Sequence, residues 1–228
     1  MAEEFSLFGE SPPPKYEEIT KVEPVIETFL PGLKNGEGYH EINDWDQLRK
    51  LNESCSACPL RAGCSQVVFG DGDNQTRIML VGEGPGQSED EIGLPFVGKA
   101  GQLLDKILEA AGFMRSKVYI TNVVKCRPPG NRLPVPQEIA VCRGYLEAQI
   151  RLIKPEIIVC LGALATQTIV DNKAKITQVR GKWYTRHDVM IMPTYHPAAL
   201  LRNEHLKRPV WEDFKLIRDE AKKRGIIA

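Results

Sequence analysis

Four short apolar runs rich in β-branched residues constrain the fold more than any other feature of this sequence. They are RIMLVGE (77–83), VYITNVVK (118–125), EIIVCLG (156–162) and VMIMPTYH (189–196). The first three are almost continuously apolar, as expected of strands buried on both faces. Segments of helical character separate the runs. This alternation predicts an α/β fold, a three-layer α/β/α sandwich around a central four-stranded parallel sheet.

Helical periodicity and helix-end signals mark the segments between these strands. GQLLDKILEAAGF has an apolar stripe at i, i+3 and i+4 spacing and a stop at Gly112, and another segment begins with Pro136, which a first helical turn tolerates. We therefore expect helices at 101–113, 136–153, 163–170 and 208–225, after a short amphipathic helix that starts near Asn43 or Asp44.

Residues 1–43 differ in composition from the rest of the chain. They contain a PPP run, many Glu residues and no sustained apolar period. Such a segment buries too little apolar surface to offset the entropy of ordering it. We therefore expect 1–43 to be an acidic disordered tail and 44–228 to form a single domain. The two aromatics of MAEEFSLFGE leave a docking peptide for a protein partner as the alternative to a solubilising tail.

The formal net charge of zero hides an uneven distribution. Residues 1–46 hold nine Glu and two Asp against three Lys, a net charge of −8, so residues 47–228 carry the balancing +8. A basic body suits a polyanionic partner such as nucleic acid. Ordinary scatter of surface charge explains the same distribution equally well, so charge alone does not decide.

Nothing in the sequence directs the chain to a membrane or a secretory route. No apolar run approaches the roughly 20 residues of a membrane span, and the acidic N-terminus lacks the basic start and apolar stretch of a signal peptide. We therefore expect a cytoplasmic monomer. Thiols stay reduced in the cytoplasm, so the six cysteines indicate metal binding or burial instead of disulfides.

Four of the cysteines have spacings that suit a metal centre. Cys55 and Cys58 form a C-x2-C pair, while Cys126 lies in a predicted loop and Cys142 in the helix after it. Thiolates from three separate places in the sequence can close a tetrahedral zinc site or hold an iron–sulfur cluster. Spacing alone does not choose between these two metals.

The other two cysteines have different surroundings. Cys160 lies within a buried apolar strand, where cysteine is usually a small core residue. Cys64 lies six residues after Cys58 and could compete as a ligand, although it would have to displace one of the better-spaced four.

The loops that carry chemical groups all follow predicted strands. GEGPG follows the first strand, Asn122 and KCRPPGNR end the second, GA follows the third, and HPAALLR follows the fourth. Ligands of open parallel sheets bind outside the carboxyl ends of the strands. We therefore expect a ligand pocket at this edge, with His196 in a catalytic role at the end of the fourth strand.

The glycine-rich loop differs from a dinucleotide-binding loop. Residues 82–87 read G-E-G-P-G-Q, so the third glycine of G-x-G-x-x-G is misplaced and Pro85 has no amide to donate. Glu83 and Glu89 are candidate functional carboxylates, whereas we interpret Asp90 and Glu91 as the solvated acidic start of a helix.

Taken in order, GEGPG, GLPFVGKAG, TNVVKCRPPGNR, VCLGA and HPAALLR, together with the four cysteines, closely resemble the family 4 (thermostable-type, iron–sulfur) uracil-DNA glycosylases. The resemblance covers residues from about 50 to 220. It implies a uracil-DNA glycosylase-like fold and a DNA-repair enzyme. Such an enzyme flips uracil out of single- or double-stranded DNA, hydrolyses its N-glycosidic bond and leaves an abasic site. It also implies a 4Fe-4S cluster on Cys55, Cys58, Cys126 and Cys142.

The resemblance also implies roles for residues of the pocket. Phe96 matches the aromatic ring on which uracil stacks, and Asn122 matches the amide that reads the uracil edge. Glu89 matches the position that narrows the pocket beside C5 and excludes the thymine methyl group. His196 matches the histidine that donates to uracil O2 as negative charge develops on the leaving base.

Other positions match contacts to the DNA. Leu200, four residues after His196, fits the apolar wedge that fills the gap left in the base stack. Arg127, Arg132 and Arg202 are candidates for phosphate contacts.

One position departs from the broader superfamily, which often has a water-activating aspartate where this chain has Gly84. Gly84 is therefore expected to contact uracil only through its backbone, and Glu83 is our candidate for the electrostatic role. A related branch traps the sugar through a histidine in an insertion, and KCRPPGNRLPVPQE has neither. We therefore expect a monofunctional enzyme that turns over.

Two other functions are compatible with the same residues. One is a non-enzymatic iron–sulfur module that binds DNA or senses redox state on the same fold. The other is a zinc-containing hydrolase that acts on another substrate. The presence of Glu83, Phe96, Asn122 and His196 together favours the glycosylase.

Overall fold

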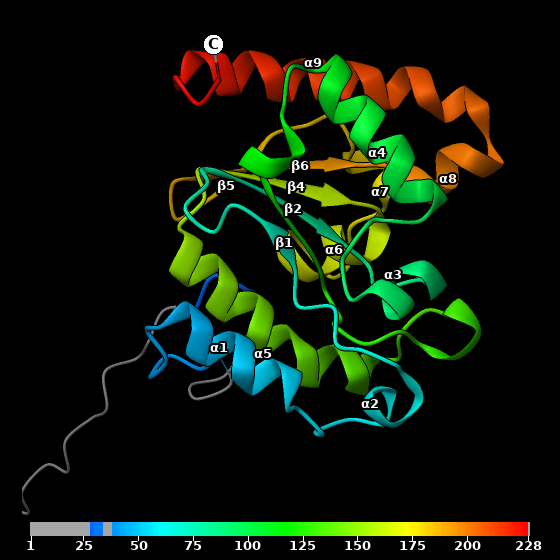
Figure 1. The fold of residues 1–228 in the computed structure, drawn as a ribbon. Helices are drawn as coiled ribbons and strands as arrows, with labels where there is room; N and C mark the ends of the chain where they lie inside the picture. The colour runs from blue at the N-terminus through cyan, green and yellow to red at the C-terminus, as the bar shows by residue number, and fades with distance from the viewer. Residues whose placement is uncertain (1–27, 34–37, 228) are drawn as a thin grey trace, which may run out of the picture.

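The computed structural model describes residues 28–33 and 38–227. Its centre is a six-stranded sheet in the order β1-β3-β2-β4-β6-β5 (Figure 1). The strands are β1 (Asp71–Gly72), β2 (Ile78–Gly82), β3 (Tyr119–Asn122), β4 (Ile157–Leu161), β5 (Tyr184–Arg186) and β6 (Val189–Thr194). Strands β3, β2, β4 and β6 are parallel, which confirms the predicted four-stranded core. The short edge strands β1 and β5 are antiparallel additions that the sequence did not predict.

The helices cover both faces of the sheet (Figure 1). They are α1 (Trp45–Glu53), α2 (Leu60–Gly63), α3 (Gln87–Ile92), α4 (Lys99–Ala110), α5 (Pro136–Ile153), α6 (Ala163–Ile169), α7 (Ile176–Val179), α8 (Pro197–Arg202) and α9 (Lys207–Lys223), with 3-10 turns η1 (Arg115–Lys117), η2 (Pro129–Asn131) and η3 (Glu204–Leu206). Helices α4, α8 and α9 lie on one side of the sheet, and α1, α5 and α6 lie on the other. The predicted three-layer sandwich is therefore confirmed. None of the described helices is long and apolar enough to cross a bilayer.

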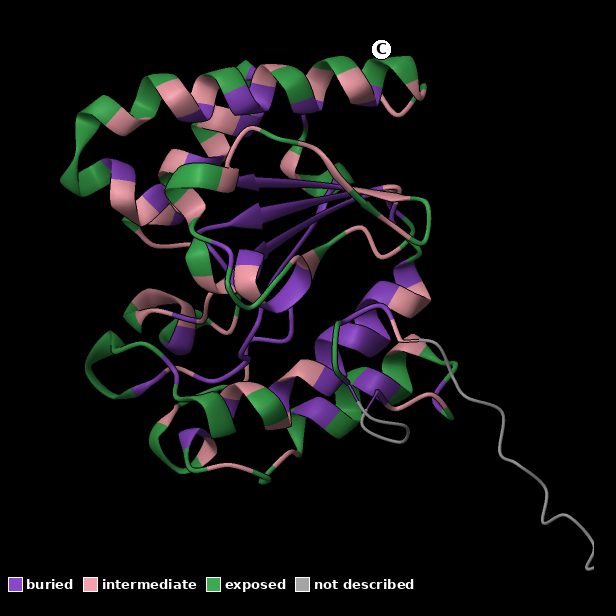
Figure 2. Ribbon diagram, turned by 180° about the vertical axis from the view of Figure 1, so that it is seen from behind, coloured by how far each residue is buried: buried purple, intermediate pink, exposed green. Residues whose placement is uncertain are grey.

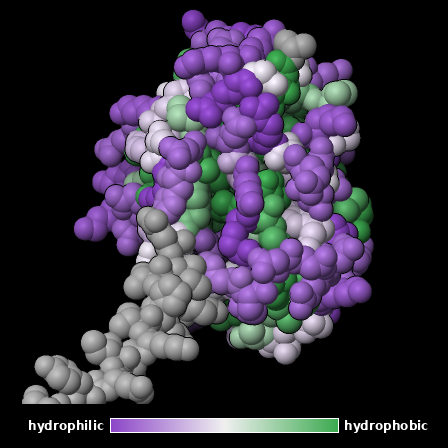
Figure 3. Space-filling model, turned by 90° about the vertical axis from the view of Figure 1, so that its left-hand side faces the viewer, coloured by the Kyte–Doolittle hydropathy of each residue, from purple (hydrophilic) through white to green (hydrophobic). Residues whose placement is uncertain are grey.

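Alternate residues of the central strands face the two helical layers. On β2, Met79 and Val81 pack in the cluster with α5, whereas Ile78 and Leu80 pack in the cluster with α4 and α9. This period of two is what a strand buried on both faces requires. Figure 2 shows the resulting buried strands between two helical layers that are exposed on their outer sides, and Figure 3 shows a mostly hydrophilic surface on the left-hand side of the molecule.

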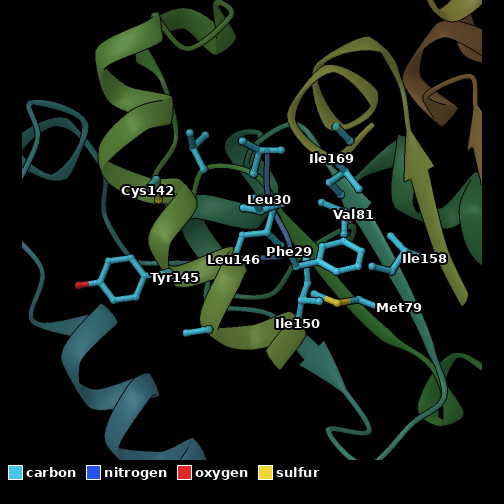
Figure 4. Packing of buried hydrophobic residues seen from close by; sticks show 14 of the residues in the cluster. Phe29, Leu30, Met79, Val81, Cys142, Tyr145, Leu146, Ile150, Ile158 and Ile169 are labelled. Atoms are coloured by element: carbon cyan, nitrogen blue, oxygen red, sulfur yellow. The ribbon is translucent and has the colours of Figure 1, made fainter. Parts of the chain in front are cut away.

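A segment before the predicted domain boundary is part of the core. Phe29 and Leu30 pack against α5 (Figure 4), and the Leu30 side chain is 0% exposed. The buried Glu147 carboxylate accepts hydrogen bonds from the backbone N–H groups of Phe29 (2.7 Å) and Leu30 (2.8 Å). The boundary predicted at residue 44 is therefore wrong for 28–33, because Glu147 and the apolar cluster hold this segment in place. Residues 1–27 of the predicted tail lie outside the described residues.

Replacing Leu30 by alanine is expected to lower the free energy of unfolding by about 2–4 kcal/mol, because it leaves a cavity in the core. The matched control is Leu216→Ala on α9, whose side chain is 43% exposed, and it is expected to change stability by less than about 0.5 kcal/mol. Urea unfolding measures both values. Equal effects would show that residues 28–33 are not part of the cooperative domain.

Candidate active site

A cavity of about 470 Å³ opens at the carboxyl ends of β2, β3 and β6. The predicted residues that line it are Glu83, Gly84, Glu89, Phe96, Asn122, Arg132, His196 and Arg202. Parallel pairing explains why they meet: β2 pairs with β3 in the register Gly82 to Asn122, so the loops after both strands leave the sheet side by side. The sequence-based prediction of a pocket at this edge is confirmed.

Asn122 carries an unused acceptor inside the pocket. Its side chain is 1% exposed, and its Oδ1 atom has no hydrogen-bond partner within the described parts of the chain. A Cβ atom on Gly82 would lie 2.4 Å from Asn122 Oδ1 and 2.6 Å from Phe96 Cζ, so only glycine allows this approach. An unpaired buried amide costs roughly 1–3 kcal/mol. A group that donates a hydrogen bond to Oδ1 would remove this cost.

Phe96 forms the aromatic wall of the pocket. Its backbone has φ 52°, a left-handed conformation that costs a non-glycine residue roughly 1–2 kcal/mol. The ring centroid lies 5.4 Å from that of His196, with the planes inclined by 31°. Phe96 is thus held in an unfavourable backbone conformation with its ring beside the histidine.

Glu89 ties two loops of the pocket together. Its Oε2 accepts from the Gly86 N–H (3.1 Å), and its Oε1 accepts from the N–H groups of Val97 (2.9 Å) and Gly98 (2.8 Å). These bonds connect the glycine-rich loop to the turn that carries Phe96. The Glu89 carboxylate is therefore fixed in orientation at the pocket wall.

The neighbouring acidic residue differs from its predicted environment. Asp90 is buried, and its carboxylate accepts from the backbone N–H groups of Ser65 (2.8 Å) and Gln66 (3.3 Å). The interpretation of Asp90 as a solvated helix start is therefore wrong, because the loop after Cys64 folds over it. Glu91 is exposed, as expected.

His196 is held as a neutral hydrogen-bond donor. It caps the N-terminus of α8, where its Nδ1 accepts from the Ala198 N–H (3.1 Å). Nδ1 is therefore unprotonated, and the ring proton lies on Nε2. Burial lowers the pKa of His196 to about 4, with a smaller contribution in the same direction from Arg202 and an opposing one from Glu89. The imidazole is thus uncharged at neutral pH.

Glu83 is the first residue of the loop after β2, and it lines the cavity. It is half-buried, and burial raises its pKa while nearby Arg202 opposes the shift. The adjacent Gly84 has little room for a side chain, because a Cβ there would lie 2.7 Å from Val124 Cγ2. A carboxylate at position 84 would require Val124 to move, whereas Glu83 already lines the cavity.

The three predicted phosphate-binding arginines have different partners. Arg132 makes a two-pronged ion pair with the buried Glu138 carboxylate, at 2.7 and 2.9 Å. Arg127 is bonded through Nε to Asn131 Oδ1 (2.7 Å), and Arg202 lines the cavity. Arg132 therefore serves first to close its own loop, which leaves Arg127 and Arg202 as the better candidates for DNA contacts.

The predicted apolar wedge is incorrect. Leu200 is 1% exposed and packs in the core, whereas Leu201 is 50% exposed. Helix α8 begins at Pro197, and its phase turns position 200 inward and position 201 outward. Leu201 is therefore the leucine of this helix that is available to DNA.

Sequence reasoning missed Lys125. Its side chain is 0% exposed, and Nζ donates to Thr121 Oγ1 (2.6 Å), the Asn122 carbonyl (2.6 Å) and Gln149 Oε1 (2.7 Å). Burial lowers the pKa of Lys125 to about 7. It braces the end of β3 that carries Asn122. The available signal was a lysine at the end of an otherwise apolar strand.

The cysteines gather on the α5 side of the sheet. Cys126 and Cys142 are buried, Cys55 and Cys58 are half-buried, and all are free thiols. Burial raises the pKa of Cys142 to about 11; the charge and the backbone N–H of Lys125 oppose this rise, and the nearby Cys58 and Cys55 add a smaller increase. The Cys126 thiol lies close enough to Cys64 for that thiol to raise the pKa of Cys126, so a fifth thiol adjoins the predicted four.

These thiols suit a metal centre by their chemistry and by their origin in separate segments. The described residues contain no group of three or more His, Cys, Asp or Glu side chains arranged to hold one metal ion. Cys160 is fully buried in β4, which confirms it as a core residue.

Comparison with known proteins identifies the family of this chain. Residues 69–215 match the model of the uracil DNA glycosylase superfamily. A type-4 uracil-DNA glycosylase from Thermotoga maritima is 49% identical over 179 residues, which cover 76% of this chain and 92% of the relative. One from Sulfurisphaera tokodaii is 47% identical over 188 residues, covering 77% and 86%. One from Pyrobaculum aerophilum is 41% identical over 181 residues, covering 76% and 92%. This chain therefore belongs to the uracil-DNA glycosylase superfamily, and within it to the type-4 uracil-DNA glycosylases.

Proposed function

We propose that Glu83, Asn122 and His196 carry out the uracil-DNA glycosylase reaction of this family in the cavity at the carboxyl edge of the sheet. The enzyme hydrolyses the bond between uracil and deoxyribose in DNA, releases free uracil and leaves an abasic site, as a step of base excision repair. The observation that carries the proposal is the buried Asn122 Oδ1, which has no hydrogen-bond partner among the residues that the structure describes.

Asn122 distinguishes uracil from cytosine by the direction of its hydrogen bonds. Its Oδ1 accepts from uracil N3–H, and its Nδ2 donates to uracil O4. Cytosine presents an acceptor and a donor in the opposite order, so its insertion would leave buried polar groups unpaired. Asn122 ends β3, and Lys125 donates to its main-chain carbonyl, so the backbone from which the amide projects is fixed.

Phe96 and Glu89 shape the space for the base. We propose that uracil stacks on the Phe96 ring, whose position beside His196 brings the stacked base near the histidine. Glu89 is fixed by three backbone hydrogen bonds at the cavity wall, where it would exclude a thymine methyl group. The backbone of Gly84 lines the same cavity.

His196 stabilises the leaving base. Its Nε2–H donates to uracil O2, and this bond strengthens as the C1′–N1 bond breaks and its electron pair passes to uracil. The Ala198 N–H holds Nδ1, so the donating tautomer is already set before the substrate arrives. The neutral imidazole can make this bond because its one ring proton lies on Nε2.

Glu83 acts on the sugar side of the bond. Its carboxylate stabilises the positive charge that develops at C1′ and accepts a proton as water adds to that carbon. The position of Glu83 at the cavity wall and the lack of room at Gly84 support this assignment.

We further propose that Arg127 and Arg202 contact phosphates and that Leu201, in place of Leu200, fills the gap in the base stack. The basic charge of residues 47–228 supports DNA binding. We propose that the protein is cytoplasmic, which its free thiols support, and that it is a monomer. A docking role of the N-terminal tail is the remaining partner proposal.

For the cysteines, we propose a 4Fe-4S cluster held by Cys55, Cys58, Cys126 and Cys142, with zinc as the alternative. Their free thiols and their origin in three segments support this set. A cluster supplies a covalent crosslink there: it would join the loop after α1 to the loop after β3, and so hold residues 126–132 beside the cavity. The Cys126 contact with Cys64 makes Cys64 the competing ligand.

The Asn122→Ala variant is expected to excise uracil about 100- to 1000-fold more slowly, because the base loses its specific partners. The assay is single-turnover cleavage, after alkali treatment, of a duplex with one U·G pair. Asn172→Ala, in an exposed loop, is the matched control. A near-normal Asn122→Ala rate would remove Asn122 from recognition, and a wild-type chain inactive on U·G, U·A and single strands would favour the DNA-binding module.

The pH dependence of His196 gives a second test. Because its pKa is lowered to about 4, the neutral donor persists at pH 5–6, and no loss of rate with a midpoint near pH 6.5 is expected from this group. Between pH 4 and pH 6.5, His196 binds more protons in the unfolded chain than in the folded one. The contribution of His196 to stability therefore falls as the pH is lowered from about 6.5 toward 4. Titration of the imidazole by NMR measures the pKa directly, and a value near 6.5 would contradict the assignment.

The metal proposal predicts iron and sulfide in the purified protein, with visible absorption. Cys126→Ala is expected to lose iron and to lower both the unfolding temperature and DNA affinity, since the loop loses its anchor. Cys64→Ala, the control at the competing position, is expected to keep its iron. A colourless protein that contains zinc would overturn the cluster, and iron loss in Cys64→Ala alone would change the ligand set.

A further inference from the structure

We propose that Arg115, which lies outside the cavity, is a positioning residue for uracil excision because it holds the turn that carries Phe96. The proposal rests on the proposed role of Phe96 as the stacking surface. Arg115 begins the 3-10 turn η1 after α4 and is not among the residues that line the cavity.

The Pro95–Gly98 turn needs external support. Phe96 adopts φ 52°, and a bulky residue keeps such a conformation only when its surroundings impose it. The turn has no regular secondary structure of its own, because α3 ends at Ile92 and α4 begins at Lys99. Its backbone polar groups must therefore find partners elsewhere.

Arg115 provides partners for the carbonyl groups. Its Nη2 donates to the Pro95 carbonyl (2.7 Å), and its Nη1 donates to the Phe96 carbonyl (3.2 Å). The guanidinium is a planar fork whose two arms can hold both oxygens at once. Asp105 on α4 accepts from Nη1 at 2.8 Å, and Asp71 on β1 lies 3.6 Å from Nη2, so the fork is itself fixed.

Glu89 holds the same turn from the cavity side. It accepts from the next two N–H groups, those of Val97 and Gly98. The carbonyls of residues 95 and 96 are thus bound to a cation, and the amides of residues 97 and 98 are bound to an anion. These hydrogen bonds on both sides fix the position of the turn and, with it, the position of the aromatic ring.

The ring has little tolerance for displacement. Two of its atoms lie 2.6 and 2.7 Å from where a Gly82 Cβ would be, and the Phe96 carbonyl oxygen lies 1.9 Å from where a Gly101 Cβ would be. Both approaches depend on glycine. If Arg115 is lost, the turn can relax toward an ordinary backbone conformation and carry the ring away from Asn122 and His196. Small displacements of this kind reduce catalytic rates strongly.

A double-mutant cycle on the single-turnover excision rate tests this. Arg115→Met and Phe96→Ala are each expected to slow excision about 10- to 100-fold. If Arg115 acts through the ring, the double variant is no slower than Phe96→Ala alone, because no ring remains to position. If Arg115 has only a general structural role, the rate losses of Arg115→Met and Phe96→Ala multiply in the double variant.

Arg77 provides a matched control. It also donates to two backbone carbonyls, those of Arg224 and Gly225, and it pairs with Glu156, but it lies at the amino end of β2. Arg77→Met is expected to lower stability without slowing excision. Arg115→Lys keeps the charge beside Asp105 but lacks the fork, so partial loss of rate is expected. If urea unfolding shows that Arg115→Met does not fold, Arg115→Lys takes its place in the double-mutant cycle.

The outcomes separate the two proposals. An unchanged rate in Phe96→Ala would refute the stacking role itself. If Phe96→Ala slows excision but the Arg115 variants excise uracil as fast as Arg77→Met, only the positioning role is refuted. Rate losses that multiply in the double variant would show that Arg115 acts by another route.

Discussion

Parallel pairing of strands that are buried on both faces brings Glu83, Asn122 and His196 to one edge of the sheet. All four central strands end at the same edge, so the loops after β2, β3 and β6 must meet there. The register of β2 with β3 sets Gly82 opposite Asn122. The Asn122 amide and the loop that carries Glu83 are therefore neighbours before any side chain makes a contact. The helices then shield both faces and leave this edge as the place for a ligand.

Most charged side chains around the pocket bind the backbone of its loops. Glu89 binds three backbone amides, Arg115 binds two carbonyls, and Glu138 with Arg132 closes the loop after β3. Lys125 does the same for the end of β3 from inside the core. Irregular loops expose many backbone groups that would otherwise need water, and these side chains supply partners in its place.

Features with a local signal were predictable from the sequence, and features that depend on distant contacts were not. The central strands and long helices follow from apolar periodicity, and the cavity follows from the loops that end them. The edge strands β1 and β5 have only two and three residues, too few for a period. Leu30 is buried through contacts with distant residues, among them Glu147, 117 positions away, which binds its amide. Leu200 was misplaced because the phase of α8 is set by packing on α4 and α9, and Arg115 has no local mark at all.

The side chains proposed to recognise the base and those proposed to hold the DNA differ in how strongly dissolved salt weakens their interactions. Asn122 and His196 are buried and uncharged at neutral pH, so dissolved ions screen their interactions very little. Arg127 and Arg202 are cations whose attraction to phosphate weakens steeply as salt is added. If these residues act as proposed, added salt would shorten the time that the enzyme stays on DNA. It would leave almost unchanged the choice between uracil and cytosine once a base has entered the cavity.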